Sequence, residues 1–321
     1  MRPAHLLLAL LTTALWGFNF VAIQVGLDSG LPPLLMAALR FVVAALPALW
    51  LPRPRIPAGR LVAIGIFLFV GQFALLFTGM AAGMPPGLAS VTQQSQAFLT
   101  ALIAAAVLRE RPSARAMAGM AVAFSGLALI GTTAGGGGMT GLGLALCLAG
   151  AGSWAVGNVL LRGAGSSPGG PVALMAWLSL VPVLPLLALS LALEGAGAIG
   201  GALVGLNLRG VASLLYLAVA ATLVGYGIWG FLMARYPATT VAPFALLVPI
   251  TGAASSALVM GESFGAVRLA GMALVVAGLA VGALRWPFAP RPGGASVTAP
   301  PPRAKTPRPL SGQPAPGKNP P

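Results

Sequence analysis

Long unbroken runs of apolar residues, separated by short polar loops, dominate the pattern of this sequence. Runs of roughly 20 apolar residues match a hydrocarbon core of about 30 Å, whereas strands of a membrane barrel would alternate over about 10 residues. The pattern therefore predicts an all-α integral membrane protein with ten transmembrane helices. These helices are expected at about residues 5–26, 33–51, 61–82, 85–108, 115–132, 140–161, 171–193, 209–232, 239–260 and 266–286.

The first run follows Arg2 and imitates a signal peptide. It continues to about Gly26 without a small-residue cleavage site, and further apolar runs follow at once. The first run is therefore interpreted as the first transmembrane helix, and the short loops leave no room for a soluble domain.

Composition supports the membrane class. Hydrophobic residues make up 58% of the chain and charged residues only 7%, with a mean hydropathy of +0.94. A soluble domain carries roughly 25% charged residues. The net charge of +14 is spread over short loops and the C-terminal end, so it indicates contact with a lipid bilayer and gives no support to nucleic-acid binding.

Loop arginines predict the orientation, because basic residues gather on the cytoplasmic side. Only Arg209 and Arg268 fall on the opposite side. Both termini are therefore expected in the cytoplasm of a bacterium, with the chain in its inner membrane. The arginines on the predicted cytoplasmic side are Arg2, Arg53, Arg55, Arg60, Arg109, Arg111, Arg115, Arg162, Arg235 and Arg285.

Like residues recur about 152 positions apart, so the chain repeats itself. The pairs include Pro85 with Pro237, Glu110 with Glu262, Gly119 with Gly271, Met120 with Met272 and Gly126 with Gly278. The repeat predicts a first five-helix unit at 1–135 and a second at 136–286. Because five is odd, the second unit is inverted in the membrane, which is typical of secondary transporters that bind substrate between the halves. Duplication kept only for packing is the alternative.

The final segment, 287–321, is rich in proline and basic residues and has almost no large apolar ones. Such a segment cannot bury a core and is predicted to be a disordered cytoplasmic tail.

Polar and aromatic side chains occur inside the apolar runs at helical spacing. They should avoid lipid and face other helices or a cavity. Interhelical hydrogen bonds, worth about 0.6 kcal/mol each, are the alternative. On a regular helix Gln94 would point roughly 100° away from Gln93 and the cavity. The candidate substrate-binding residues are Trp16, Asn19, Arg40, Gln72, Gln93, Gln96, Trp154, Asn158, Tyr226 and Trp229.

Arg40 is the charge that lies deepest inside a predicted span, about 10 Å from its nearer end at 1.5 Å per residue. It could pair with a substrate carboxylate, or it could extend to the lipid headgroups. The first interpretation is preferred, because a charge in mid-span is usually functional.

Several chemistries lack support in the sequence. Glu110 and Glu262 precede predicted helix starts, where an acid stabilises a helix N-terminus, and no acid lies deep in a span. There is no P-loop, no metal-ligand cluster and no nucleophile–base pair. We therefore expect no enzyme activity, no cofactor and no metal site.

Several stretches together resemble the EamA family of the drug/metabolite transporter superfamily, over about residues 5–286. They are Leu15-Trp16-Gly17-Phe18-Asn19-Phe20, Leu39-Arg40-Phe41, Gln72-Phe73-Ala74, Gly83-Met84-Pro85 with Gly87-Leu88-Ala89-Ser90, Gln94-x-Gln96-Ala97-Phe98, Ser153-Trp154-Ala155 with Gly157-Asn158, Val224-Gly225-Tyr226-Gly227-Ile228-Trp229-Gly230, and Val241-Ala242-Pro243 with Leu246-Leu247-Val248-Pro249. Within the family, the resemblance is greatest to bacterial exporters of O-acetylserine and cysteine. The proline-rich tail departs from the family pattern.

The resemblance implies efflux of small zwitterionic, amino-acid-like metabolites such as cysteine and O-acetylserine by alternating access. A broader amino-acid or drug efflux permease is an alternative. A non-transporting membrane assembly factor is another, although the short loops offer little docking surface. A homo-oligomer is compatible with any of these.

Overall fold

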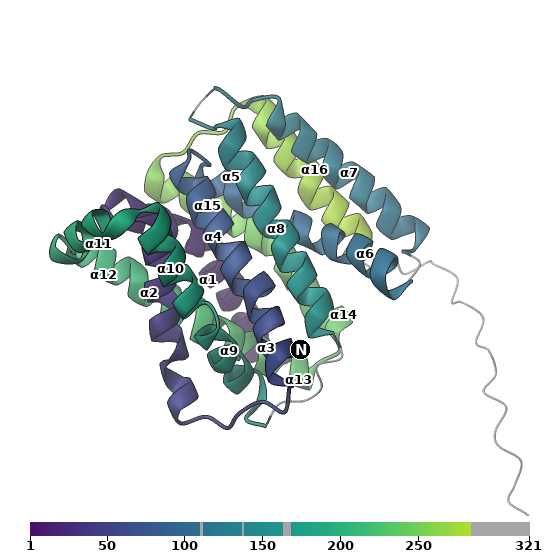
Figure 1. Ribbon diagram of the computed structural model, residues 1–321. Helices are drawn as coiled ribbons and strands as arrows, with labels where there is room; N and C mark the ends of the chain where they lie inside the picture. Colours follow the sequence, from purple (N-terminus) through teal and green to yellow (C-terminus); the bar gives the residue numbers. More distant parts are fainter. Residues whose placement is uncertain (110–111, 137, 163–167, 284–321) are drawn as a thin grey trace, which may run out of the picture. The chain divides into compact units, whose positions relative to one another are not determined.

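The computed structural model is helical, without strands, over the residues it describes: 1–109, 112–136, 138–162 and 168–283 (Figure 1). The first half contains α1 (Pro3–Asp28), α2 (Pro33–Ala45), η1 (Leu46–Leu49), α3 (Ala58–Gly65), η2 (Ile66–Gly71), α4 (Gln72–Ala81), α5 (Pro86–Thr92), α6 (Ser95–Leu108) and α7 (Ala114–Gly131). The second half contains α8 (Gly141–Leu161), α9 (Gly170–Leu180), α10 (Val183–Leu193), α11 (Gly195–Val204), α12 (Leu208–Leu215), η3 (Tyr216–Val224), α13 (Gly225–Arg235), α14 (Ala238–Val241), η4 (Ala242–Leu247), α15 (Val248–Met260) and α16 (Ala266–Ala283).

Within these described ranges, nine helical stretches are long and apolar enough to cross a membrane. The remaining predicted span corresponds to Pro33–Leu49, which is apolar but shorter. The predicted fold class is confirmed, with ten as an approximate count. One helix was not expected: α11 is a short apolar helix where the glycine-rich sequence after the seventh span predicted a loop.

The packing of the helices follows the predicted repeat. In the first half, α1 packs against α15 and α13 of the second half. In the second half, α8 packs in the corresponding way against α6 and α4 of the first. The first helix of each repeat therefore contacts the third and fourth spans of the other repeat, and the two halves interlock.

The last helices of the two repeats, α7 and α16, lie side by side (Figure 1). A Cβ placed on Gly119 would lie 2.5 Å from the carbonyl oxygen of Gly278, and one on Gly126 would lie 2.5 Å from that of Gly271. Only glycine allows this backbone approach. Because the numbers rise along α7 while they fall along α16, the two helices are antiparallel, which is the relation expected of an inverted repeat.

Corresponding spans of both repeats contain segments without regular α-helical geometry. The third and eighth spans contain the π-helical segments η2 and η3. The fourth span is interrupted between α5 and α6, and the ninth contains the 3₁₀ segment η4, where Pro243 stands at the start. Such irregular segments leave backbone groups free for side chains and are tolerated in a membrane where protein or a cavity surrounds them.

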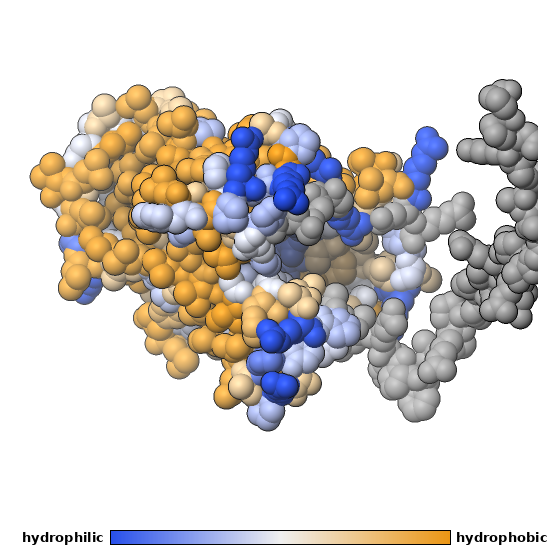
Figure 2. All heavy atoms as spheres, turned by 90° about the horizontal axis from the view of Figure 1, so that it is seen from below, coloured by the Kyte–Doolittle hydropathy of each residue, from blue (hydrophilic) through white to orange (hydrophobic). Residues whose placement is uncertain are grey.

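The surface of the helical bundle is largely apolar. Large side chains such as Leu7, Leu184 and Leu258 are exposed, as expected of residues that face lipid. Seen from the side at which α1 begins, hydrophilic residues gather around a hollow near the centre of the face, with hydrophobic residues beside them (Figure 2). The predictions on Glu110, Arg111, Arg285 and the 287–321 tail concern positions outside the described residues.

Candidate functional site

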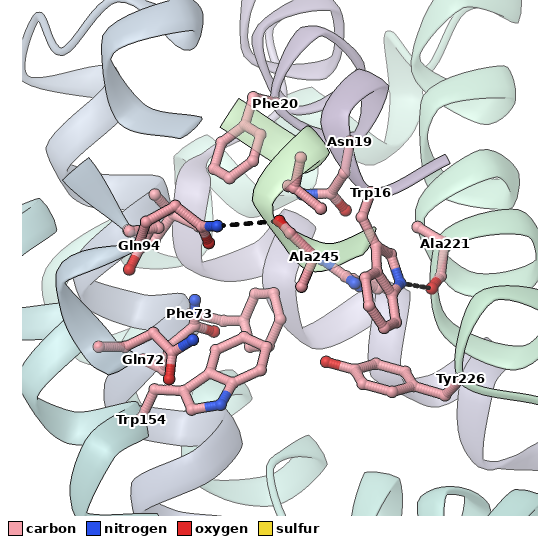
Figure 3. Close-up of a pocket in the computed structure, with 15 residues that line it drawn as sticks. Trp16, Asn19, Phe20, Gln72, Phe73, Gln94, Trp154, Ala221, Tyr226 and Ala245 are labelled. Atoms are coloured by element: carbon pink, nitrogen blue, oxygen red, sulfur yellow. Dashed lines mark hydrogen bonds between the residues drawn. The ribbon is translucent and has the colours of Figure 1, made fainter. Parts of the chain in front are cut away.

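A cavity lies between the two repeats, and seven spans contribute to its wall (Figure 3). The lining residues are Trp16, Asn19, Phe20, Arg40, Gln72, Phe73, Leu76, Gln93, Gln94, Gln96, Trp154, Ala221, Tyr226, Ala245 and Val248. All of the candidate residues except Asn158 and Trp229 are among them. Their binding of substrate stays a prediction, but the structure brings their side chains together.

Arg40, on α2, is the cation of this cavity. Its side chain is only 3% exposed, so it does not extend to the headgroups. The guanidinium Nε and Nη2 donate to Thr222 Oγ1 at 3.2 and 3.0 Å, and Cζ lies 4.3 Å from the centre of the Phe73 ring. The third nitrogen, Nη1, is buried without a hydrogen-bond partner among the described residues.

The π-helical segment η3 places the partner of Arg40. The hydroxyl of Thr222 donates to the carbonyl of Leu217, five residues earlier, at 2.8 Å, and accepts from Arg40. The carbonyl of Ala221 accepts from the indole Nε1 of Trp16 at 3.0 Å (Figure 3). One irregular segment thus fixes both the cation and an aromatic ring of the cavity.

Aromatic rings form much of the remaining wall. The Trp16 ring centre lies 5.2 Å from that of Tyr226 and 5.2 Å from that of Trp229. Trp154, from the other repeat, lies 6.2 Å from Phe73 between ring centres. These faces can contact apolar groups or, through their quadrupoles, a ligand cation.

The glutamines of the fourth span all line the cavity, so the expectation that Gln94 points away is wrong. That expectation assumed a regular helix, but the helix is interrupted between Thr92 and Ser95. Backbone bonds of the i to i+3 kind, such as Gln96 N to Gln93 O at 3.2 Å, replace the regular pattern there. Gln94 instead donates from Nε2 to the carbonyl of Ala245 at 3.1 Å (Figure 3).

Asn158 and Trp229 are not among the lining residues, which differs from their predicted place. Asn158 accepts from Trp154 Nε1 at 3.1 Å and donates to Gln96 Oε1 at 3.1 Å, so it positions two lining side chains. Trp229 packs on Trp16. Each of the two residues therefore contacts side chains that line the cavity without being a lining residue itself.

The candidate set omitted Gln94 and Phe73. The Arg40 guanidinium lies over the ring of Phe73. Phe73 follows Gln72 and gives no polar signal, although the stretch Gln72-Phe73-Ala74 belongs to the family resemblance. Apolar lining residues such as Ala245 could not be told from lipid-facing ones by composition.

Two carboxylates tie the halves together at the end of the bundle where α1 ends. Glu194 accepts from the backbone nitrogens of Leu34 and Leu35, at 2.6 and 3.1 Å, at the start of α2. Glu262 accepts from the backbone nitrogen of Gly87 at 2.9 Å, at the start of α5, and from Ser256 Oγ. Glu262 therefore stabilises a helix N-terminus as expected, but that of α5 in the other repeat.

Fold and site together define a class of protein. Two inverted repeats of membrane-spanning helices enclose a cavity that is lined by both aromatic and polar side chains, which is the architecture of secondary transporters. Among the described residues no group of three or more His, Cys, Asp or Glu side chains could hold a metal ion.

The chain belongs to the EamA-like transporter family. The family model matches it twice, over residues 4–132 and 141–283, in agreement with the repeat. It is 45% identical to a probable amino-acid metabolite efflux pump of Salmonella typhimurium, covering 85% of this chain and 92% of that protein. A protein of the same description from Escherichia coli is 41% identical, over 87% of this chain and 95% of its own length.

A solved crystal structure has the same fold. It superposes with a TM-score of 0.59 at 19% identity, and covers 88% of this chain and 96% of the other. The protein is therefore a multi-pass membrane protein of a transporter family.

Proposed function

We propose that this protein exports small amino-acid-like metabolites from the bacterial cytoplasm across the inner membrane. The twofold family match and the two efflux pumps above 40% identity support export of such metabolites. Both termini would lie in the cytoplasm, as the loop arginines indicate. The chain would act as a transporter and catalyse no chemical step.

The observation that carries the proposal is the buried guanidinium of Arg40. A buried charge without a counter-ion is costly, by several kcal/mol. Arg40 forms no salt bridge in the part of the chain that the structure describes, and its Nη1 remains a free donor beside the cavity. A substrate carboxylate would supply both the counter-ion and the missing acceptor.

Alternating access would move one repeat against the other around this site. The hollow on the face where α1 begins suits entry from the cytoplasm (Figure 2). At the opposite end, Glu194 and Glu262 join the second repeat to helix starts of the first. Opening toward the far side would require these contacts to separate.

Cysteine and O-acetylserine are the proposed substrates, because the family resemblance is greatest to exporters of these compounds. A broader amino-acid or drug efflux permease is the second candidate. It is favoured by the aromatic wall of Trp16, Trp154 and Tyr226, which can accept apolar side chains of different shapes.

Uptake into inverted membrane vesicles tests the proposal. Vesicles that contain the protein should accumulate or exchange labelled cysteine, O-acetylserine or another amino acid faster than vesicles without it. The pattern of accepted substrates separates the narrow from the broad exporter. Equal rates for every amino acid with and without the protein would contradict export.

A further inference from the structure

We propose that the amide oxygens of Asn19, Gln72 and Gln93 form a binding site for the α-ammonium group of the substrate. This inference rests on the proposed function and adds to it how the amino group is recognised. Arg40 would take the carboxylate, and three uncharged oxygens would take the ammonium group, with no acidic residue involved.

The cavity wall holds buried polar atoms without partners among the described residues. Buried side-chain oxygens in folded proteins are nearly always hydrogen-bonded. Asn19, Gln72 and Gln93 are 8%, 2% and 7% exposed, yet Asn19 Oδ1, Gln72 Oε1 and Gln93 Oε1 have no hydrogen-bond partner within the described residues. All three residues line the cavity that Arg40 also lines. The three oxygens would need hydrogen-bond donors from a ligand, whereas the likewise unpartnered Gln93 Nε2 would need an acceptor.

Three separate elements bring these oxygens to one cavity. Asn19 comes from α1, Gln72 from the start of α4, and Gln93 from the break between α5 and α6. In Figure 3, Asn19 and Gln72 point into the same cavity. Gly150 on α8 lies against both of the last two: a Cβ there would be tight against the Gln72 backbone carbonyl oxygen at 3.0 Å and in ordinary contact with Gln93 Nε2 at 3.5 Å.

The chemistry of the set matches an α-amino acid head group. An ammonium group has three N–H donors, and each amide oxygen can accept at least one of them. It also matters that these acceptors are uncharged, because they lie in the same cavity as the guanidinium of Arg40. A carboxylate here would pair with Arg40 and fill the site, whereas a neutral acceptor leaves the guanidinium free for the substrate.

Such a site selects for the free amino group. A site built to hydrogen-bond a substrate N–H rejects an analogue that lacks it, because the buried acceptors are then left unpaired. The protein should therefore discriminate against deaminated and N-acylated analogues of its substrates, independently of the substrate side chain.

Competition binding to the purified full-length chain in nanodiscs tests the inference. Labelled L-cysteine and labelled O-acetylserine are each displaced by three kinds of competitor. The first is the unlabelled amino acid. The second lacks the amino group, as in 3-mercaptopropionate and 3-acetoxypropionate. The third carries a blocked amino group, as in N-acetylcysteine.

The wild-type chain should prefer the free amino acid to the deaminated and N-acylated compounds by roughly 10- to 100-fold, the loss expected for hydrogen bonds to a charged group. Gln72→Met, Gln93→Met and Asn19→Leu should each reduce this preference severalfold and leave the affinity for 3-mercaptopropionate within about twofold. Gln94→Met is the matched control, since Gln94 lines the same cavity but its amide already bonds Ala245. It should change all affinities by the same factor.

Equal displacement by free and deaminated compounds on the wild-type chain would overturn the inference and leave the proposed function in place. A preference that survives in all three folded variants would do the same. If the wild-type chain binds no amino acid at all, the proposed function fails and the ammonium site with it.

Discussion

Under the proposed function, Arg40 is the residue on which substrate recognition would depend most. We expect Arg40→Gln to lower the affinity for amino acids by about 10- to 100-fold, because a charge-assisted hydrogen bond to the carboxylate is lost. Cysteamine, which lacks the carboxylate, should bind equally well to the wild type and to Arg40→Gln. Transport assays and competition by cysteamine in the same vesicles measure the change in amino-acid affinity and the unchanged cysteamine affinity. Normal amino-acid transport by Arg40→Gln would show that this side chain is only structural.

Thr222 gives a second test at the scale of one residue, because it fixes the guanidinium through Nε and Nη2. Thr222→Val keeps the shape but removes the acceptor. It should lower the free energy of unfolding by about 1–3 kcal/mol and weaken amino-acid binding. Thr222→Ser keeps the hydroxyl and should restore binding. A Val variant that binds like the wild type would contradict the positioning role of Thr222.

The sequence located most of the cavity at this scale. Polar side chains inside apolar runs, such as Asn19 and Gln96, could be predicted to face inward because lipid excludes them. Which of two neighbours on one face reaches the cavity could not be predicted. Asn158 shares a face with Trp154 and bonds both Trp154 and Gln96, yet only the latter two line the cavity.

At the scale of elements, the membrane-spanning helices and their approximate number followed from hydropathy, but their irregular segments did not. A helical period assumes 3.6 residues per turn, so η3 and the break after Thr92 were invisible to it, and the Gln94 prediction failed for that reason. At η4 the sequence does carry a signal, because Pro243 stands at its start and a proline cannot donate a backbone hydrogen bond.

The Glu262 contact allows a prediction about how the elements are held. Glu262→Gln keeps one acceptor for Gly87 N but loses the charge that favours the N-terminus of α5. We expect the free energy of unfolding to fall by about 1–2 kcal/mol, and Glu262→Ala to lower it further. Thermal unfolding in detergent measures both variants.

Flux through Glu262→Gln should keep the same dependence on a pH gradient as the wild type, because the carboxylate has a structural role. If the substitution abolished flux driven by a pH gradient but left exchange intact, Glu262 would instead be a coupling group.

At the scale of the whole molecule, the antiparallel pair of α7 and α16 fixes the inverted relation of the repeats but leaves their direction in the membrane to the loop charges. A reporter that is active only in the periplasm, fused after the last residue, should be inactive, whereas a cytoplasmic reporter at the same position should be active. An active periplasmic reporter would reverse the proposed direction of the chain.

Ala245→Cys tests whether amino acids occupy the cavity between the repeats. Ala245 lines the cavity, and the exchange keeps every polar group proposed to bind substrate. The native Cys147 is fully buried, so the background of thiol modification should be low. The measurement is the rate at which a small aqueous thiol reagent modifies the variant in inverted vesicles. We expect the reagent to modify the variant. Amino acids without a thiol, such as O-acetylserine, should slow this modification, whereas their deaminated analogues should not. A thiol that is unreactive from both sides of the membrane, or one that reacts at the same rate with and without amino acid, would contradict the account.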